Sequence, residues 1–202
     1  NQPRIGSWNL ARFAETLLPL ISENAEQAVE LATQALQQFN MLNETEFRRL
    51  MGIKLGITEP VATDEPLIRD YLTLMVKNNA DFTLAFRLLS QSVIDSSAGA
   101  AGLFADNNAW QDWAIRWHKR LSEQGMSTAD IMQQMNQINP ALIPRNHQIA
   151  KALELAANQG DLSLFNRLHK ALKTPFELSA EDADLAQPPT PEQCIGNTFC
   201  GT

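Results

Sequence analysis

The stretch WQDWAIRWHKRL (residues 110–121) places three tryptophans at helical spacing. Trp110, Trp113 and Trp117 follow one another at three and four residues, so one face of an α-helix would carry all three rings together with Leu121. Such a stripe could form an exposed aromatic platform for a ligand. Because large aromatic side chains at this spacing more often fill a core, we interpret the stripe as the core-facing side of a helix.

A second strongly apolar segment lies upstream, FTLAFRLLSQSV (residues 82–93). Its apolar residues occur on nearly all sides of a helix, which is typical of a buried central helix. Asn79 or Asp81 is a suitable N-cap for this helix, because a side-chain oxygen there can accept from the first free backbone N–H groups. We therefore expect residues 82–93 to lie at the centre of the fold.

The rest of the chain carries further helical patterns. Apolar periodicity, capping residues and stops at glycine or proline predict seven more helices. They lie at about 8–21 with Ser7 as N-cap, 24–39, 43–55, 66–75, from 127 onward, 146–159 and 161–172. No strand is predicted. The sequence therefore predicts an all-α fold of about eight to nine helices, followed by an extended, proline-containing tail from residue 176.

The composition is that of an ordinary globular protein. Of the 202 residues, 44 % are apolar and 19 % are charged. The net charge of −7 disfavours nucleic acid as a partner, because binding to a phosphate backbone usually needs a basic surface. No apolar run approaches the length of a membrane span, so we expect no membrane partner.

The sequence contains no recognisable catalytic constellation. The histidines His118, His147 and His169 do not lie in a metal-ligand spacing, and glycine-rich phosphate loops and nucleophile motifs are missing. We therefore predict no catalytic, cofactor-binding or metal residue in this chain. Acidic residues occur at helix starts or in the tail, where we expect solvated capping roles: Asp64, Glu65, Glu181, Asp182 and Asp184.

Two arginines require specific partners. Arg87 lies within the apolar segment 82–93, and we expect it to pair with Asp70 or Asp81. Arg145 lies at a helix start, where the helix dipole disfavours positive charge, so it too should have a defined partner. For both residues we favour a structural ion pair, and contact with a ligand is the alternative.

Several motifs together resemble the C-terminal half of the selenoprotein O family. The order and spacing carry the resemblance, since each motif alone is weak. The matching stretches are NQPRIGSWNLARFAETLLP (1–19), FRRLMGIKLGI (47–57), DFTLAFRLLS (81–90), Trp110 and Trp113 with Arg120 and Leu121, NPALIPRN (139–146) and AANQGDLSLFNRLHKALKTPF (156–176).

The resemblance implies a pseudokinase-fold protein adenylyltransferase that binds ATP and Mg²⁺ and transfers AMP to Ser, Thr or Tyr hydroxyls of proteins. The family's nucleotide-binding and metal-binding residues lie upstream of residue 1. We therefore expect this chain to be a fragment that is inactive alone, with the missing N-terminal catalytic half as its partner. By the same resemblance the longer protein would be bacterial and cytoplasmic.

The resemblance also implies a division of the chain. Residues 1–56 would complete the C-lobe of the kinase-like fold, residues 64–173 would form an appended helical region, and residues 174–202 would be a flexible tail. Separating the first helices from the N-terminal half would expose apolar surface. We therefore expect the fragment to self-associate.

The two cysteines, Cys194 and Cys200, lie in the last nine residues. Two cysteines are neither a disulfide framework nor a zinc site. In the resembling family the terminal cysteine or selenocysteine is linked to redox control, which implies a regulatory role for Cys200. Cys194 offers a local disulfide partner that would compete with a cysteine upstream of residue 1, and two free thiols are the third possibility.

Two other functions remain open from the sequence. The chain could be a stand-alone helical module for protein interaction. It could also be a thiol-redox protein that uses Cys194 and Cys200, although it lacks a CxxC motif and a thioredoxin-like βαβ pattern.

Overall fold

The computed structural model describes residues 2–194, and every regular element in that range is a helix. The predicted all-α fold is therefore confirmed. The α-helices are α1 (Gln2–Ile21), α2 (Ala25–Lys54), α3 (Glu65–Lys77), α4 (Phe82–Leu89), α5 (Asn107–Ser122), α6 (Thr128–Ile138), α7 (Asn146–Gln159) and α8 (Ser163–Ala171). The short 3-10 helices are η1 (Ala62–Asp64), η2 (Gln91–Val93), η3 (Gly99–Leu103), η4 (Ala180–Ala186) and η5 (Pro191–Gln193).

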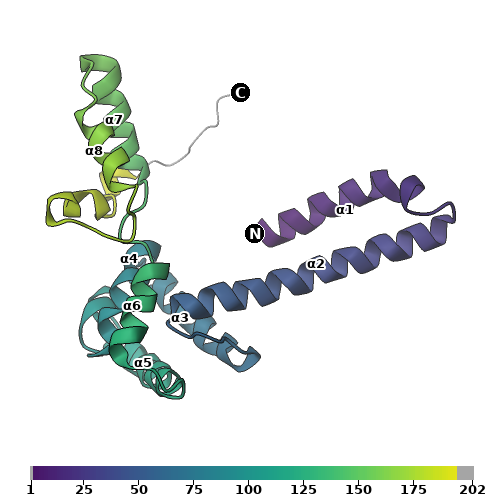
Figure 1. Cartoon of the computed structure of the whole chain (residues 1–202), viewed down its shortest axis with the longest axis horizontal. Helices are drawn as coiled ribbons and strands as arrows, with labels where there is room; N and C mark the ends of the chain where they lie inside the picture. Colours follow the sequence, from purple (N-terminus) through teal and green to yellow (C-terminus); the bar gives the residue numbers. More distant parts are fainter. Residues whose placement is uncertain (1, 195–202) are drawn as a thin grey trace.

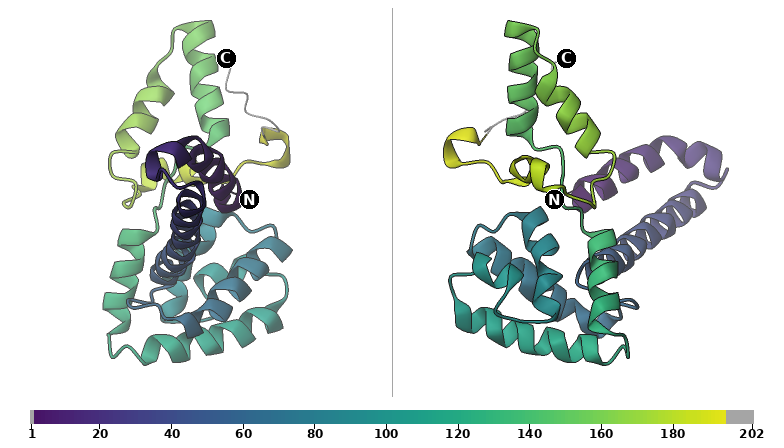
Figure 2. Two further views of the ribbon diagram at one scale, coloured as in Figure 1. Left: turned by 90° about the vertical axis from the view of Figure 1, so that its right-hand side faces the viewer. Right: turned by 60° about the vertical axis from the view of Figure 1, so that its left-hand side comes forward.

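The helices form three parts (Figure 1). Helices α1 and α2 make an antiparallel hairpin, here called the arm, which extends away from the other helices in Figure 1 and in the right-hand view of Figure 2. The body consists of α3 to α6 and the C-terminal end of α2, packed around the main hydrophobic core. The C-terminal unit consists of α7, α8 and η4 around a second, smaller core.

The tryptophan stripe of α5 forms the centre of the body. Trp110, Trp113 and Trp117 are at most 1 % exposed, and the ring of Tyr71 lies 4.6 Å from that of Trp113. Each indole N–H donates to a backbone carbonyl, that of Ser96, Leu67 and Leu55 in turn, at 2.8–2.9 Å. The stripe is therefore core, as predicted, and its polar atoms are satisfied in place.

Helix α4 is buried as predicted but shorter than the predicted segment. The Asp81 carboxylate accepts from the Leu84 N–H at 2.9 Å and so caps the helix. Ala85, Phe86 and Leu89 face the core, and after Leu89 the chain continues as η2.

The arm differs most from the prediction. Helix α1 begins at Gln2, because Pro3 is tolerated in a first turn and Ser7 therefore need not be the cap. Helix α2 runs through the predicted break between residues 39 and 43. No proline or glycine interrupts it before Gly52, so the weak capping pattern at Asn43 loses to continuous backbone hydrogen bonds. Three predicted helices are thus two, with Asn24 as the N-cap of α2.

The segment after α8 is more ordered than its sequence indicates. It is predicted to be extended from residue 176, yet it contains η4 and η5. Leu185 and Ala186 of η4 are buried and pack with residues of α7 and α8. Arg167 of α8 binds the carboxylates of Asp182 and Asp184 and so holds η4 against the pair of helices α7 and α8. Leu185 and Ala186 form a single short apolar pair without helical periodicity, and such a signal is too weak to predict the packing of η4 from the sequence.

Candidate functional site

Groups capable of chemistry are scattered over the described part of the chain. The His118 ring nitrogens lie 2.9 Å from the Ala114 and Ser92 carbonyl oxygens, and the His169 ring stacks on Phe165. Partial burial and the nearby positive Arg145 lower the pKa of His147. Within residues 2–194, no three His, Cys, Asp or Glu side chains lie together as metal ligands. No helix there has the length and apolarity to cross a membrane.

The prediction that Arg87 pairs with Asp70 or Asp81 is wrong. Its Nη1 donates to the carbonyl oxygens of Asn136 and Asn139 at 2.9 and 3.1 Å, and so caps the C-terminal end of α6. Because a helix C-terminus is a partial negative charge, it replaces the carboxylate expected. Asp70, one of the two expected partners, instead pairs with Arg116.

Arg145 has the defined partner that its position predicts. Its Nη1 and Nη2 donate to the two carboxylate oxygens of Asp81 at 2.8 and 2.9 Å, and its Nε donates to the Ala186 carbonyl. The hydrogen bonds from Arg145 lower the pKa of the Asp81 carboxyl. Arg145 therefore connects Asp81 of the body with Ala186 of the C-terminal unit, and it acts as a structural ion pair, as predicted.

The expectation of solvated acidic residues is wrong for Asp64. This residue is buried, and its carboxylate accepts from Arg120 Nε at 2.7 Å. It also accepts from the Val61 N–H at 2.9 Å, which closes η1. The sequence showed an acidic helix start but not the arginine 56 residues away that makes burial tolerable.

The arm presents an apolar groove. It has a volume of about 400 Å³ and runs between α1 and α2. All of its lining residues are apolar: Leu10, Phe13, Ala14, Leu17, Ile21, Leu31, Ala32, Ala35, Leu36 and Phe39. Large apolar side chains elsewhere on the arm are also exposed, with Trp8 at 62 % and Leu20 at 82 %. A contiguous apolar surface of this kind marks a site of protein contact.

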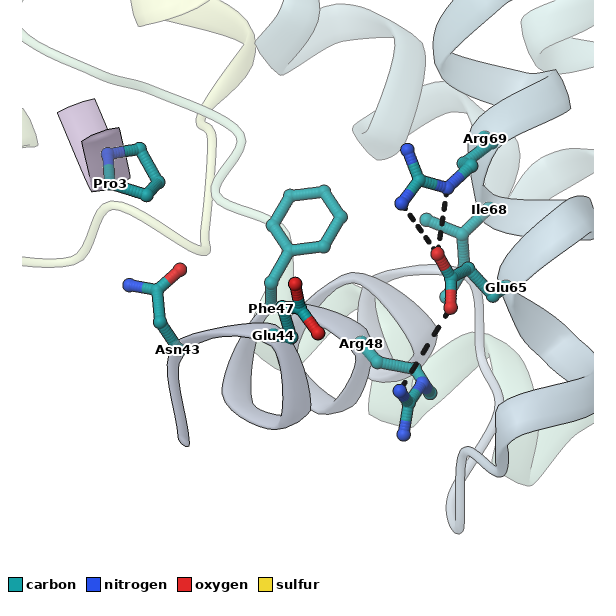
Figure 3. Close-up of a pocket in the computed structure, with 8 residues that line it drawn as sticks. All are labelled: Pro3, Asn43, Glu44, Phe47, Arg48, Glu65, Ile68 and Arg69. Atoms are coloured by element: carbon teal, nitrogen blue, oxygen red, sulfur yellow. Dashed lines mark hydrogen bonds and ion pairs between the residues drawn. The ribbon is translucent and has the colours of Figure 1, made fainter. Parts of the chain in front are cut away.

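A second cavity, here called the basal pocket, lies where the arm joins the body. Its volume is about 330 Å³, and it is lined by Pro3 of α1, by Asn43, Glu44, Phe47 and Arg48 of α2, and by Glu65, Ile68 and Arg69 of α3. Figure 3 shows Glu65 between the guanidinium groups of Arg48 and Arg69. Arg69 donates to Glu65 Oε1 from Nε at 2.8 Å and also from Nη2, whereas Arg48 Nη2 lies 3.9 Å from Oε2.

The sequence analysis did not predict the basal pocket. The adjacent arginines in FRRL (residues 47–50) were a signal, because one of them had to lie near the apolar stripe of the helix. Glu65, however, follows a linker of irregular structure, so no spacing rule connects it with Arg48. Only the tertiary structure brings them together.

The predicted redox residues lie at the end of the chain. Cys194 follows η5 and is exposed. Cys200 lies outside the described residues. The role predicted for these cysteines stays a prediction.

Two cavities of the described residues are the apolar groove and the basal pocket, which the arm helps to form. The groove lies on the arm and the basal pocket lies between the arm and α3 of the body, and neither is lined by a nucleophile beside a base.

Comparison with known proteins identifies relatives over the whole chain. The family model described as protein adenylyltransferase SelO matches residues 1–173. A protein nucleotidyltransferase YdiU from Bradyrhizobium diazoefficiens is 42 % identical over 203 residues, and one from Geobacillus kaustophilus is 42 % identical over 202 residues. A further YdiU from Alkaliphilus metalliredigens is also 42 % identical. Each alignment covers 100 % of this chain but only 40–41 % of the relative.

Proposed function

Because this chain belongs to the SelO family of protein adenylyltransferases, we propose that it is the C-terminal helical part of such an enzyme. The whole protein would transfer AMP from ATP to Ser, Thr or Tyr hydroxyls of acceptor proteins. The chain spans about two fifths of the length of the relatives it matches, which supports this proposal. The proposal includes a bacterial cytoplasmic location, as its bacterial relatives suggest.

The residues described do not fit a site for ATP and Mg²⁺. Magnesium with nucleotide phosphates needs carboxylates grouped around an open cavity. Asp64 and Asp81 are each held by an arginine, Glu44 and Glu65 line the basal pocket together with two arginines, and no group of three metal-ligating side chains forms within residues 2–194. The nucleotide and metal would therefore bind to a part of the protein outside this chain, and this chain would be inactive alone.

The observation that carries the proposal is the uncovered arm. A hairpin of two helices with an apolar groove does not bury enough surface for its own stability, so a further element should cover it. The remaining part of the enzyme is the natural candidate, because it is longer than this chain and would be covalently attached. The arm would then be an interior part of the complete protein.

Intact mass after incubation with Mg²⁺ and ATP tests this proposal. Three samples contain a generic acceptor protein: one with this chain, one with the protein extended upstream to the length of its relatives, and one with neither. AMP adducts only with the extended protein support the proposal. No adduct with the extended protein, under reducing conditions, contradicts it.

The apolar arm also favours a second candidate function, a stand-alone helical module for protein interaction. In that case this chain alone would bind a defined partner through the groove. The two candidates differ in the mass experiment, because the module predicts no AMP transfer from either length of protein.

We also propose that the C-terminal cysteines regulate the enzyme through their redox state. The exposure of Cys194 supports access by oxidants or by another thiol. Peptide mapping of the oxidised extended protein would test the proposal by showing whether Cys200 pairs with Cys194 or with an upstream cysteine. Two free thiols after mild oxidation would contradict it.

A further inference from the structure

The basal pocket contains an arginine without a suitable partner. The Arg48 side chain is 24 % exposed, and its Nε is the one buried side-chain nitrogen or oxygen in residues 2–194 without a hydrogen-bond partner. Removing a charged donor from water without replacing its hydrogen bonds costs more than removing a neutral one. A group that is absent from the described residues should therefore complete this site.

Glu65 does not satisfy Arg48. Its Oε1 accepts both hydrogen bonds from Arg69, and the 3.9 Å from Oε2 to Arg48 Nη2 is too long for a hydrogen bond. One carboxylate is thus shared unequally between two guanidinium groups. A second carboxylate in the pocket would give Arg48 the bidentate contact that guanidinium groups favour.

The walls of the pocket indicate what carries this carboxylate. Phe47, Ile68 and Pro3 are apolar, and Asn43 offers an amide. A cavity of about 330 Å³ has room for an amino-acid side chain and its neighbours. Because Glu44 and Glu65 line the pocket beside the two arginines, a singly charged acidic side chain on a peptide segment fits it better than a more highly charged, strongly hydrated phosphate does.

We propose that the basal pocket binds an acidic side chain from the segment that precedes residue 1 in the longer protein, with Arg48 as its main partner and Arg69 beside it. The inference rests on the proposed function, because it requires that longer protein. Pro3 lies in the first turn of α1 and lines the same pocket as Arg48, on the opposite side, so the chain enters α1 at the edge of this pocket (Figure 3). The contact would fix the arm where the upstream part joins it.

Glu44 is the internal competitor for this role. It lies one helical turn before Arg48 and also lines the pocket, so a change of rotamer could bring its carboxylate to Arg48. A test must therefore separate Glu44 from an external carboxylate.

The NMR signal of the Arg48 Nε–Hε group is a direct readout, assigned by its loss in Arg48→Lys. In chain 1–202, butyrate should shift this signal saturably, because it supplies a carboxylate on a short apolar chain. Butyramide, its uncharged analogue, should not shift it.

Arg48→Gln should raise the dissociation constant of butyrate, measured calorimetrically, about tenfold or more. Arg49→Gln, which removes the neighbouring arginine that pairs with Glu46, should leave it unchanged.

The same signal in the upstream-extended protein identifies the source of the carboxylate. There it should already lie at the butyrate-bound position and should not respond to butyrate. A signal that still responds in the extended protein would overturn the inference. So would a response to inorganic phosphate alone, or a signal that ignores butyrate and moves only in Glu44→Gln.

The thermal midpoint gives an independent readout. Arg48→Met should leave the midpoint of chain 1–202 unchanged or raise it, because it removes a partly buried charged group whose Nε has no hydrogen-bond partner. The same variant should lower the midpoint of the extended protein, because it leaves the acidic side chain unpaired. Equal effects in both proteins would contradict the inference. The AMP-transfer assay is separate, so the extended protein can transfer AMP while Arg48 fails this test, or the reverse.

Discussion

The arm and the body carry apolar residues with the same helical periodicity, but the two regions bury them to different extents. In the body, Trp113 is 1 % exposed, and its ring contacts Tyr71 of α3 and both Trp110 and Trp117 of its own helix. In the arm, Trp8 is 62 % exposed although it belongs to the apolar pattern of α1. In the body, several helices enclose the apolar side chains in a core. In the arm, each helix packs against only one other helix, so part of its apolar surface stays exposed.

This difference separates two kinds of information in a sequence. Apolar periodicity shows which residues seek a partner surface, but it does not show whether that surface belongs to the same chain. In the body, helices on either side of α5 supply the partner surface. In the arm the described residues leave much of the apolar surface uncovered.

Replacement of one tryptophan in each region should give the largest contrast. Trp113→Ala should lower the free energy of unfolding by about 3–5 kcal/mol, because it opens a cavity in the core and leaves the Leu67 carbonyl without its donor. Trp8→Ala should change it by less than about 0.5 kcal/mol, because its ring is exposed. Urea unfolding followed by far-UV circular dichroism measures both. Similar losses in the two variants would mean that the arm is covered in solution.

The next largest contrast in the free energy of unfolding should come from removing one ion pair from each region. Arg145→Gln should cost about 2–4 kcal/mol, since loss of one partner from a buried pair costs on the order of 3–5 kcal/mol and Asp81 keeps some contact with water. Arg12→Gln in the arm removes an exposed pair with Glu15 and should cost at most about 0.5 kcal/mol. Hydrogen exchange should show faster opening of α7 and α8 in the first variant only. Unchanged exchange there would contradict the role of Arg145 as the connection.

The pH dependence of stability should follow the same pair. Because Arg145 lowers the pKa of Asp81 in the folded state, its contribution is complete above the unfolded pKa of about 4 and is lost as the pH falls through the folded value. Asp81→Asn should remove this acid-dependent loss, which unfolding of wild type and variant at several pH values below 5 would measure. If the free energy of unfolding falls equally with pH in both proteins, carboxylates other than Asp81 control the loss of stability in acid.

The sequence predicted the body better than the arm or the C-terminal unit. The tryptophan stripe was correct, and Asp81 is one of the two caps predicted for α4, because both features depend on residues close in the chain. The continuous α2 was missed, since a local capping pattern at Asn43 competed with long-range continuity.

The contacts of the candidate site could not be predicted for a related reason. Arg48 meets Glu65 only after the chain has turned between α2 and α3, and Arg145 meets Asp81 across 64 residues. Sequence reasoning indicated that Arg145 needed a partner but could not choose it. For Arg87 it chose a carboxylate where the structure uses backbone carbonyls. Charge requirements can be predicted, but the group that meets them depends on the tertiary fold.

Glycine replacements should give effects of opposite sign in the two regions. A methyl group at Gly52 would overlap the ring of Pro60, and the overpacking should cost about 1–2 kcal/mol net of the gain in helix propensity. At Gly6 in α1 the nearest atom of a neighbouring side chain to such a methyl group would be Phe39 Cζ at 3.8 Å, so Gly6→Ala should stabilise by about 0.5–1 kcal/mol. Thermal unfolding of both variants measures the difference. A destabilised Gly6→Ala would indicate a closer helix contact in the arm than the structure shows.

The smallest effect on folding, and the most direct test of the arm, should come from a charge placed in its groove. Chain 1–202 should self-associate at high concentration, because an apolar groove that lacks its natural cover can be covered by a second copy. Phe13→Asp should weaken this association about tenfold or more while leaving the body folded, since Phe13 is already largely exposed. Val76→Asp, at an exposed position of the body, should not change it. Sedimentation equilibrium over a wide concentration range distinguishes the three proteins. A wild-type chain that stays monomeric throughout would contradict the expectation and would show that the uncovered groove is not enough to bring two copies together.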